Sequence, residues 1–308
     1  MKGLDLSRTY FEEVGLPALE SACPGLHGRI AAGLVGEGSE CLGYDDALSR
    51  DHDWGPGFCL WLTGEDMERF GIRAREAYDA LPREYLGFSR LREDPMSAGR
   101  VGVFSVEGFY RRFLERTTPP ETAVDWLVLP EQALSVCTNG AVFRDDVGAF
   151  TAFREALLSY YPEDVRRKRL AARCALAAQA GQYNFPRCLQ RGDRVAALRA
   201  LAEFIDHSQA ALFLLNRRYR PYYKWAHRAL LDLPLGGRAA ASLFQALTEG
   251  ALEWRTCQVE AISALVIRLL GEQGLSQEDS DFLLPHARAV QAGICAPEVQ
   301  ELPLMSCL

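Results

Sequence analysis

Two short groups of residues near the amino terminus have the types and spacing to bind a polyphosphate together with a metal ion. Gly38 would let the backbone approach a ligand closely, and Ser39 adds a hydroxyl donor beside it. Asp51 and Asp53 stand two positions apart, so in a strand both carboxylates would project from one face. Two such charges repel unless a cation lies between them, and hard oxygen ligands suit Mg²⁺. Together the groups predict phosphoryl or nucleotidyl transfer.

Strands are expected to position these residues. Arg29–Val35 is a short apolar run that ends in Gly-Glu-Gly-Ser, which predicts a buried strand followed by a tight turn. A second strand is expected around Asp51–Thr63, interrupted near Gly55-Pro56-Gly57. Val101–Val106 alternates small and apolar residues and predicts a third strand.

The remainder of the chain predicts helices. Helical patterns cover residues 5–22 and 65–81, and from about 147 onward one helix is expected to follow another. Asp146, Pro162-Glu163-Asp164 and Asp193 are expected to open the first helices of that part. The sequence therefore predicts an α+β protein, with mixed strands and helices over residues 1–146 and an all-α helical bundle over residues 147–308.

The pattern of an apolar run, Gly38-Ser39 and then Asp-x-Asp resembles that of the polymerase-beta-like nucleotidyltransferase superfamily. Gly43 and Ser49 also resemble positions in its minimal members. The whole chain, including GSECLGYDDALSRDHD, YYPEDVRRK and LLNRRYRPYYKW, looks like an uncharacterised bacterial family known only as a domain of unknown function. Its layout is similar to that of the aminoglycoside nucleotidyltransferases, which join a mixed sheet with flanking helices to a helical domain.

This resemblance implies a Mg²⁺-dependent nucleotidyltransferase. Gly38 and Ser39 would hold the β- and γ-phosphates of a nucleoside triphosphate, expected to be ATP, while Asp51 and Asp53 would ligate two Mg²⁺ ions. AMP would then pass to a hydroxyl of an acceptor, which the resemblance leaves open as a small molecule, an RNA or a protein. Nucleic acid is expected only in that role.

The chain also departs from the superfamily pattern. His52 stands between the two acids, where an apolar residue is usual, and Gly102 occupies the place on a later strand where a third carboxylate normally falls. Glu107 is the nearest substitute for that catalytic acid, although its odd spacing from position 102 turns it to the other side of a regular strand. Further candidates are Asp125, Asp145 and Asp146.

Two basic segments offer possible phosphate contacts. Asn216–Trp225 concentrates Arg, Lys, Tyr and Trp at a predicted helix junction, where cations would pair with phosphates and rings would stack on a base. Because related helical domains place a Lys and a Tyr against the nucleotide, Lys224 is the preferred contact, followed by Arg218 and Tyr223. The alternative is an aromatic-rich packing corner. Arg166–Arg169 is either a solvated face or a second phosphate contact.

The composition of the chain argues against some functional classes and predicts where the protein is located. A net charge of -7 over 308 residues argues against a dedicated nucleic-acid binder. The nine cysteines have no metal-binding spacing and are expected to be free thiols in a reducing cytosol. The sequence shows neither the apolar core of a signal peptide nor a run that would span a bilayer, so a soluble cytoplasmic protein without membrane contact is expected.

More than one function remains open at this stage. The first is the nucleotidyltransferase described above. The second is a catalytically impaired nucleotide-binding sensor or partner-binding module that keeps the fold, which Gly102 favours. A purely structural two-domain protein is the third, and an open cleft lined by Ser39, Asp51, Asp53 and Lys224 would exclude it.

Overall fold

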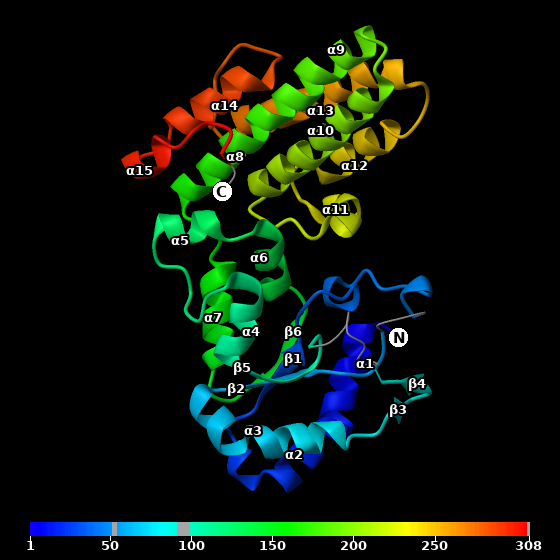
Figure 1. Ribbon diagram of the computed structural model, residues 1–308, viewed down its shortest axis with the longest axis vertical. Coiled ribbons are helices and arrows are strands. Elements are labelled where there is room, and N and C mark those ends of the chain that lie inside the picture. The colour runs from blue at the N-terminus through cyan, green and yellow to red at the C-terminus, as the bar shows by residue number, and fades with distance from the viewer. Residues whose placement is uncertain (51–53, 91–98, 307–308) are drawn as a thin grey trace. The chain divides into compact units, whose positions relative to one another are not determined.

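The computed structural model of the protein describes residues 1–50, 54–90 and 99–306. The chain forms two compact units (Figure 1): unit 1 comprises Met1–Pro119 and Ala133–Ser159, and unit 2 comprises Pro120–Gln132 and Tyr160–Leu308. The sequence suggested a single division between residues 146 and 147, whereas these units divide after residues 119, 132 and 159. The predicted α+β class is confirmed, because a mixed sheet with helices precedes a largely helical region.

Unit 1 contains a four-stranded mixed sheet with the order β5-β2-β1-β6. Its strands are β1 (Ala31–Leu34), β2 (Cys59–Leu62), β5 (Gly102–Ser105) and β6 (Ala141–Asp145). β1 runs antiparallel to β2 and β6, and β2 runs parallel to β5. Two further strands, β3 (Glu84–Tyr85) and β4 (Phe88–Ser89), form a separate hairpin. Three of the sheet's four strands fall within segments predicted as strands.

Helices cover both faces of this sheet. They are α1 (Gly3–Tyr10), α2 (Leu16–Ala22), α3 (Gly64–Asp79), α4 (Val106–Leu114) and α7 (Ala149–Leu158), and a π-helical turn, Phe11–Gly15, joins α1 to α2. The helical patterns expected over residues 5–22 and 65–81 are confirmed. α6 (Glu131–Thr138) begins in unit 2 and continues into unit 1.

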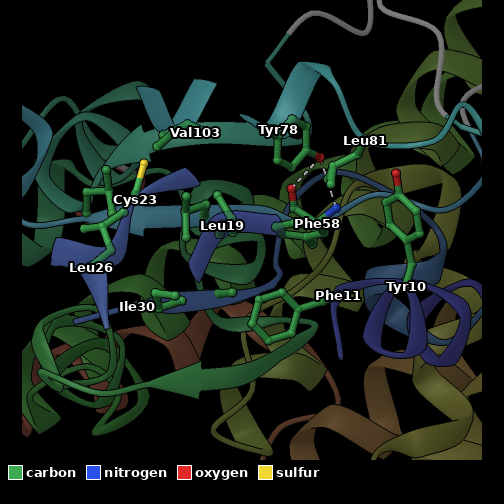
Figure 2. Packing of buried hydrophobic residues seen from close by; sticks show 14 residues of the cluster. Tyr10, Phe11, Leu19, Cys23, Leu26, Ile30, Phe58, Tyr78, Leu81 and Val103 are labelled. Atoms are coloured by element: carbon green, nitrogen blue, oxygen red, sulfur yellow. Dashed lines mark hydrogen bonds between the residues drawn. The ribbon is translucent and has the colours of Figure 1, made fainter. Parts of the chain in front are cut away.

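One face of the sheet packs against α1, α2 and α3 (Figure 2). Phe58, Leu60 and Leu62 point toward these helices and are fully buried. Tyr78 of α3 donates its hydroxyl to the Phe58 carbonyl (2.8 Å) and accepts from the Phe58 N–H (3.2 Å). Each large apolar side chain buried here contributes roughly 1.5–3 kcal/mol. This burial holds β2 in place. In the sequence, β2 follows the predicted acidic pair.

The opposite face packs aromatic rings of α4 and α7. Trp61 of β2 stacks on Phe150 at 3.6 Å between ring centroids, and Tyr110 stacks on Phe153 at 3.7 Å. Because successive strand residues point to opposite faces, Trp61 lies on the other side of the sheet from Leu60 and Leu62. β2 is thus buried on both faces.

The segment that joins β6 to α7 corrects two predictions. β6 was not predicted, since its five residues, all half-buried, lack an apolar alternation. Asp146 does not cap α7: its carboxylate accepts from the Ile30 N–H (2.9 Å) and from Arg144 (2.8 Å). Asp145 takes the capping role, since its carboxylate accepts from the N–H groups of Gly148 and Thr151, each at 2.8 Å.

Unit 2 is helical. Its helices are α5 (Ala123–Val128), α8 (Glu163–Ala177), α9 (Phe185–Gln190), α10 (Arg194–Leu215), α11 (Tyr223–Ala229), α12 (Gly237–Ala246), α13 (Arg255–Glu272), α14 (Leu283–Ala292) and α15 (Pro297–Gln300). A π-helical segment, Ala178–Asn184, links α8 to α9. Asp193 caps α10 by accepting from the Ala196 N–H (3.0 Å), as predicted. Among the described residues, no helix has the length and apolar content needed to cross a membrane.

Candidate functional site

The turn that follows β1 is clamped by a side chain distant in sequence. Asn139 donates its amide to the Gly36 carbonyl (2.7 Å), and its carbonyl oxygen accepts from the Gly36 N–H (3.0 Å). A short 3₁₀ turn, Glu40–Leu42, follows and ends at Gly43, whose φ of 72° favours glycine. These contacts hold residues 37–39 between two fixed points.

Among the described residues, three successive backbone N–H groups of this turn have no acceptor. Within the part of the chain that the structure describes, the N–H groups of Glu37, Gly38 and Ser39 donate no hydrogen bond. Consecutive unpaired N–H groups in a turn form a concavity that suits an anion, because each presents a partial positive charge. We refer to residues 37–39 as the donor turn. Its chemistry matches the phosphate contact expected of Gly38 and Ser39.

The Ser39 hydroxyl lies beside a second serine. Its oxygen is 3.3 Å from the Ser49 hydroxyl oxygen. Ser49 in turn belongs to a tight turn in which the Asp46 carboxylate accepts from the N–H groups of Leu48 (2.9 Å) and Ser49 (3.1 Å). Ser39 is half-buried, so its hydroxyl is held in place while part of the side chain remains accessible.

Gly38 packs directly against a buried ion pair. Arg100 lies 3.0 Å from the Glu40 carboxylate, and the two residues' side chains are 15% and 6% exposed. A Cβ at Gly38 would lie 2.2 Å from the Glu40 carboxylate oxygen and 2.4 Å from the Arg100 guanidinium. Close packing on this pair is thus a second reason for glycine at position 38, besides the predicted approach of a ligand.

Arginines near the donor turn were missed by the sequence analysis. Arg100 immediately precedes β5, and Arg112 of α4 pairs with Glu37 at 3.2 Å. Arg112 also donates to the Gly99 carbonyl. A basic residue directly before a predicted strand was the available signal, but only the sheet order shows that β5 begins near the turn after β1.

Asp45 is a buried acid beside this region that sequence reasoning did not single out. Its carboxylate accepts from the Gly3 N–H (2.8 Å) and from the Trp54 indole (3.1 Å), and Lys2 lies 3.5 Å away. Burial alone would raise the pKa of Asp45, but these donors and the Lys2 charge outweigh it and lower the pKa. Asp45 is therefore an ionised group that ties the amino terminus to this region.

The predicted metal ligands Asp51 and Asp53 lie outside the described residues. The described strand β2 begins at Cys59, and residues 54–58 are not in a strand. Over residues 1–50, 54–90 and 99–306, no three His, Cys, Asp or Glu side chains are grouped so that they could hold a metal ion.

The structure does not bring Glu107 together with the donor turn. β5 pairs in parallel with β2, with Gly102 opposite Cys59 and Ser105 opposite Leu62. The turn after β1 lies at the Cys59 end because β1 is antiparallel to β2. Glu107, in the first turn of α4, follows the other end of β5, roughly 10 Å further along strands that rise about 3.3 Å per residue.

The looser candidates for a third acid have structural roles. Asp125 forms a capping box with Thr122 in α5, where its carboxylate accepts from the Thr122 N–H (3.0 Å). Asp145 and Asp146 accept the backbone and arginine donors described above. None of the three was predicted to be engaged in this way, because caps and cross-strand contacts depend on element boundaries that the sequence leaves uncertain.

Arg218, Tyr223 and Lys224 lie together in unit 2, at and before the start of α11. All three are exposed, with Tyr223 at 68%. The Tyr222 and Tyr223 ring centroids are 4.3 Å apart, and the Lys224 ammonium lies 5.3 Å from the centre of the Trp225 ring. The Arg218 carbonyl accepts from the Tyr160 hydroxyl at 3.4 Å. The side chains of Tyr223 and Lys224 are thus accessible at the start of α11, and that of Arg218 is accessible earlier in the chain.

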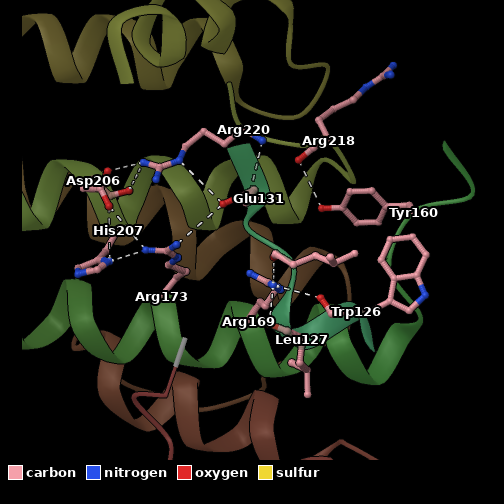
Figure 3. A network of polar contacts seen from close by, with 11 residues as sticks. Trp126, Leu127, Glu131, Tyr160, Arg169, Arg173, Asp206, His207, Arg218 and Arg220 are labelled. Carbon is pink, nitrogen blue, oxygen red and sulfur yellow. Dashed lines mark hydrogen bonds and ion pairs between the residues drawn. The ribbon is translucent and has the colours of Figure 1, made fainter. Parts of the chain in front are cut away.

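A second polar cluster in unit 2 was not predicted (Figure 3). Buried Glu131 lies 3.9 Å from Arg220 and 4.0 Å from Arg173, and Asp206 pairs with both arginines at 2.6 and 3.6 Å. Burial would raise the pKa of Asp206, but the Arg220 hydrogen bond and charge lower it. We call Glu131, Arg173, Asp206, His207 and Arg220 the charge network.

The basic run Arg166–Arg169 is a set of structural anchors rather than a phosphate contact. Arg166 pairs with Glu163 (2.8 Å), and Arg167 donates to the Gly293 carbonyl (2.8 Å). Lys168 donates to the carbonyls of Pro303, Leu304 and Ser306, and Arg169 to those of Trp126, Leu127 and Leu129. These residues therefore form neither a solvated face nor a triphosphate contact, the two alternatives considered from the sequence. The sequence alone could not show which distant groups they contact.

Comparison with known proteins identifies one matching region. Residues 126–226 match the family model described as "Domain of unknown function (DUF4037)", which extends from α5 to α11. The matched segment contains the whole charge network and the Arg218–Lys224 group, but not the donor turn. No curated protein and no solved structure matches the chain. The comparisons therefore name no homologue that would tie it to the nucleotidyltransferases.

Proposed function

We propose that the protein binds a nucleoside triphosphate, ATP, at the donor turn of unit 1 and transfers its nucleotidyl group to an acceptor hydroxyl. The observation that carries the proposal is the set of unpaired N–H groups at Glu37, Gly38 and Ser39. Backbone donors of this kind bind phosphate oxygens without the cost of moving side chains. The Asp51 and Asp53 pattern supports the same function.

The described donors fit the anionic part of this ligand. The Ser39 hydroxyl would donate to a phosphate oxygen, while Arg100 adds positive charge beside the turn. Mg²⁺ would be held by Asp51 and Asp53, since the nearby carboxylates of Asp45 and Asp46 already accept hydrogen bonds. When bound, the ions supply neutralisation of phosphate charge and activation of a hydroxyl.

In the proposed reaction the acceptor oxygen bonds to the α-phosphorus, and the bond to pyrophosphate breaks. The donor turn would retain the β- and γ-phosphates during this exchange, so it stabilises the leaving group. Arg218, Tyr223 and Lys224 stay predicted nucleotide contacts, with cations for phosphate and rings for the base. The acceptor is a hydroxyl of a small molecule, an RNA or a protein, and the proposed setting is cytoplasmic.

A second function is favoured by the position of Glu107. Because that acid lies beyond the far end of β5, Glu107 is not the third carboxylate of the donor turn within the described residues. A nucleotide-binding sensor or partner-binding module would need the donor turn but no such group. In that case nucleotide would bind while pyrophosphate release stayed at background.

Calorimetric titration of the full chain with a non-hydrolysable ATP analogue and Mg²⁺ tests the proposal. Asp51→Asn and Asp53→Asn should each weaken Mg²⁺-linked binding by about tenfold or more, which is roughly 1.4 kcal/mol. Asp79→Asn, at an exposed position in α3, is the matched control and should bind like wild type. Absence of Mg²⁺-linked binding by the wild-type protein would refute both functions, and binding without pyrophosphate release would favour the second.

A further inference from the structure

Unit 2 has a partly open cavity that the proposed reaction does not use. Its volume is ≈ 370 Å³, and it lies between α10 and the stretch of chain that leads from the end of α8 through the π-helical segment to α9. Sites for small molecules typically measure about 300–1,000 Å³. The cavity is therefore of a size for a small metabolite rather than a nucleotide or a polymer.

One wall of the cavity carries a line of charged and polar groups. Arg199, Glu203 and His207 are spaced by one turn each along α10, so they share one face of the helix. Arg199 pairs with the Glu203 carboxylate, and the other Glu203 oxygen lies 3.4 Å from Nε2 of His207. Glu203 is thus held from both sides.

The charge network determines the protonation of His207. Arg173 approaches Nδ1 of His207 at 3.0 Å, and a guanidinium can only donate, so Nδ1 must be an acceptor. The ring proton therefore lies on Nε2, which is 3.4 Å from the Glu203 carboxylate. Burial and then the Arg173 charge lower the pKa of His207 to about 4, while Asp206 and Glu203 oppose that shift. The imidazole is therefore neutral near pH 7.

The remaining walls are largely apolar. Leu176 of α8, Ala180 of the π-helical segment and Ala200 of α10 line the cavity, and the amides of Gln179 and Asn184 stand on its exposed rim. The lining thus combines a cation, an anion and apolar surface within one small volume. A ligand that satisfies all three must be a zwitterion with an apolar group.

We propose that this cavity binds a free α-amino acid with an apolar side chain, its ammonium on Glu203 and its carboxylate on Arg199. The two protein charges already meet, so one molecule that carries an ammonium and a carboxylate on the same carbon reaches both. Arg199 is 76% exposed, and an exposed i,i+4 pair contributes little, so the ligand separates the pair at small cost. The apolar side chain would lie against Leu176, Ala180 and Ala200. No residue of this site belongs to the proposed nucleotide site.

The test is calorimetric titration of the full chain with L-leucine, L-methionine and L-phenylalanine, each alone. N-acetyl-L-leucine, which lacks the ammonium, and L-leucine methyl ester, which lacks the carboxylate, should each bind at least about tenfold more weakly than L-leucine. Glu203→Gln should weaken L-leucine binding by a similar factor, and Ala200→Phe, which fills the cavity, should abolish it. Glu249→Gln removes the same charge at an exposed site elsewhere in unit 2 and should have no effect.

Thermal unfolding of each variant shows whether it is folded before its binding is compared. The proposal is overturned if none of the three amino acids gives saturable binding up to about 10 mM, a weak limit on the affinity scale. It is equally overturned if a folded Ala200→Phe protein binds L-leucine like wild type, or if the N-acetyl and methyl ester derivatives bind as tightly as the amino acid.

Discussion

The donor turn of unit 1 and the charge network of unit 2 use polar groups in opposite ways. In the donor turn, the N–H groups of Glu37, Gly38 and Ser39 have no acceptor within the described residues. In the charge network, buried Glu131 and Arg220 meet opposite charges from the same unit. The N–H groups of the donor turn can thus bind a ligand, whereas the polar groups of the charge network bind one another and stabilise unit 2.

This difference separates structural charge from binding charge. Burying an ion without a partner is costly, so the arginines of unit 2 are matched by carboxylates and carbonyls. An unpaired N–H at an accessible turn costs little, because water satisfies it until a ligand arrives. A basic run such as Arg166–Arg169 is therefore weaker support for phosphate binding than a short turn whose backbone N–H groups have no acceptor within the described residues.

The largest expected effect is on the structural side of the comparison. Arg169→Met would remove a buried guanidinium that donates to the carbonyls of Trp126 (3.2 Å), Leu127 (2.9 Å) and Leu129 (2.6 Å). We expect a loss of about 3–5 kcal/mol in the free energy of unfolding, measured in urea, because those carbonyls lose their donor. Arg268→Met, at an exposed ion pair of α13, should cost less than about 0.5 kcal/mol. Equal losses would contradict the distinction.

The next effect is a pH dependence of the free energy of unfolding that is due to His207. Its folded pKa of about 4 lies below the ordinary histidine pKa of 6.5, so the unfolded chain takes up the proton first. The stability that this group contributes is present above pH 6.5 and is lost as pH falls toward 4, by roughly 3 kcal/mol. His207→Asn keeps an acceptor for Arg173 but does not titrate. Urea unfolding across this range should show a shallower pH slope for the variant, and identical slopes would contradict the prediction.

A smaller effect is expected where the donor turn meets the fold. Gly38→Ala would place a Cβ against the Glu40 and Arg100 ion pair, so we expect a loss of about 1–3 kcal/mol in unfolding free energy. Gly64→Ala is the control, because a Cβ there meets nothing within 4 Å at the start of α3. That control should be neutral or stabilising by up to about 1 kcal/mol. If Gly38→Ala left the free energy of unfolding unchanged, the Glu40 and Arg100 side chains would be able to move aside at little cost.

The smallest effect concerns the ligand alone. Ser39→Ala would remove the hydroxyl beside Ser49 without altering the backbone donors. Affinity for the ATP analogue should fall by about 3- to 10-fold, as expected for one hydrogen bond of roughly 0.5–1.5 kcal/mol. Calorimetry would measure it, with Ser242→Ala on α12 as the control. An unchanged affinity would remove Ser39 from the proposed site while leaving the N–H groups in it.

The parts of the fold that burial dictates could be predicted from the sequence. The apolar runs of β1 and β5 have no stable alternative to a buried strand, and Asp193 marks the start of α10 by its side-chain chemistry. β6 was not predicted, because it forms a strand by pairing with β1 and its own residues show no strand pattern. Asp146 was misassigned as a cap by one position, since Asp145 makes that contact.

The candidate site divides in the same way. A tight turn after β1 could be predicted, because the apolar run ends in Gly-Glu-Gly-Ser, while the phosphate contact of Gly38 and Ser39 stays a prediction. Arg100 and Glu107 could not be placed, because their positions depend on β5 pairing in parallel with β2. That register brings Arg100 to the turn after β1 and sends Glu107 to the far end of the strand. Local features can thus be predicted from the sequence, whereas contacts between residues distant in the sequence can be predicted only when the sheet topology is known.

Backbone amide NMR of the full chain, titrated with a non-hydrolysable ATP analogue and Mg²⁺, tests the central claim most directly. We predict saturable shifts of the Glu37, Gly38 and Ser39 amide signals, because unpaired N–H groups would acquire phosphate acceptors. The amides of the charge network should be unaffected by ligand in the same titration if its groups are already satisfied. Saturable nucleotide binding that leaves the signals of residues 37–39 in place would contradict the account.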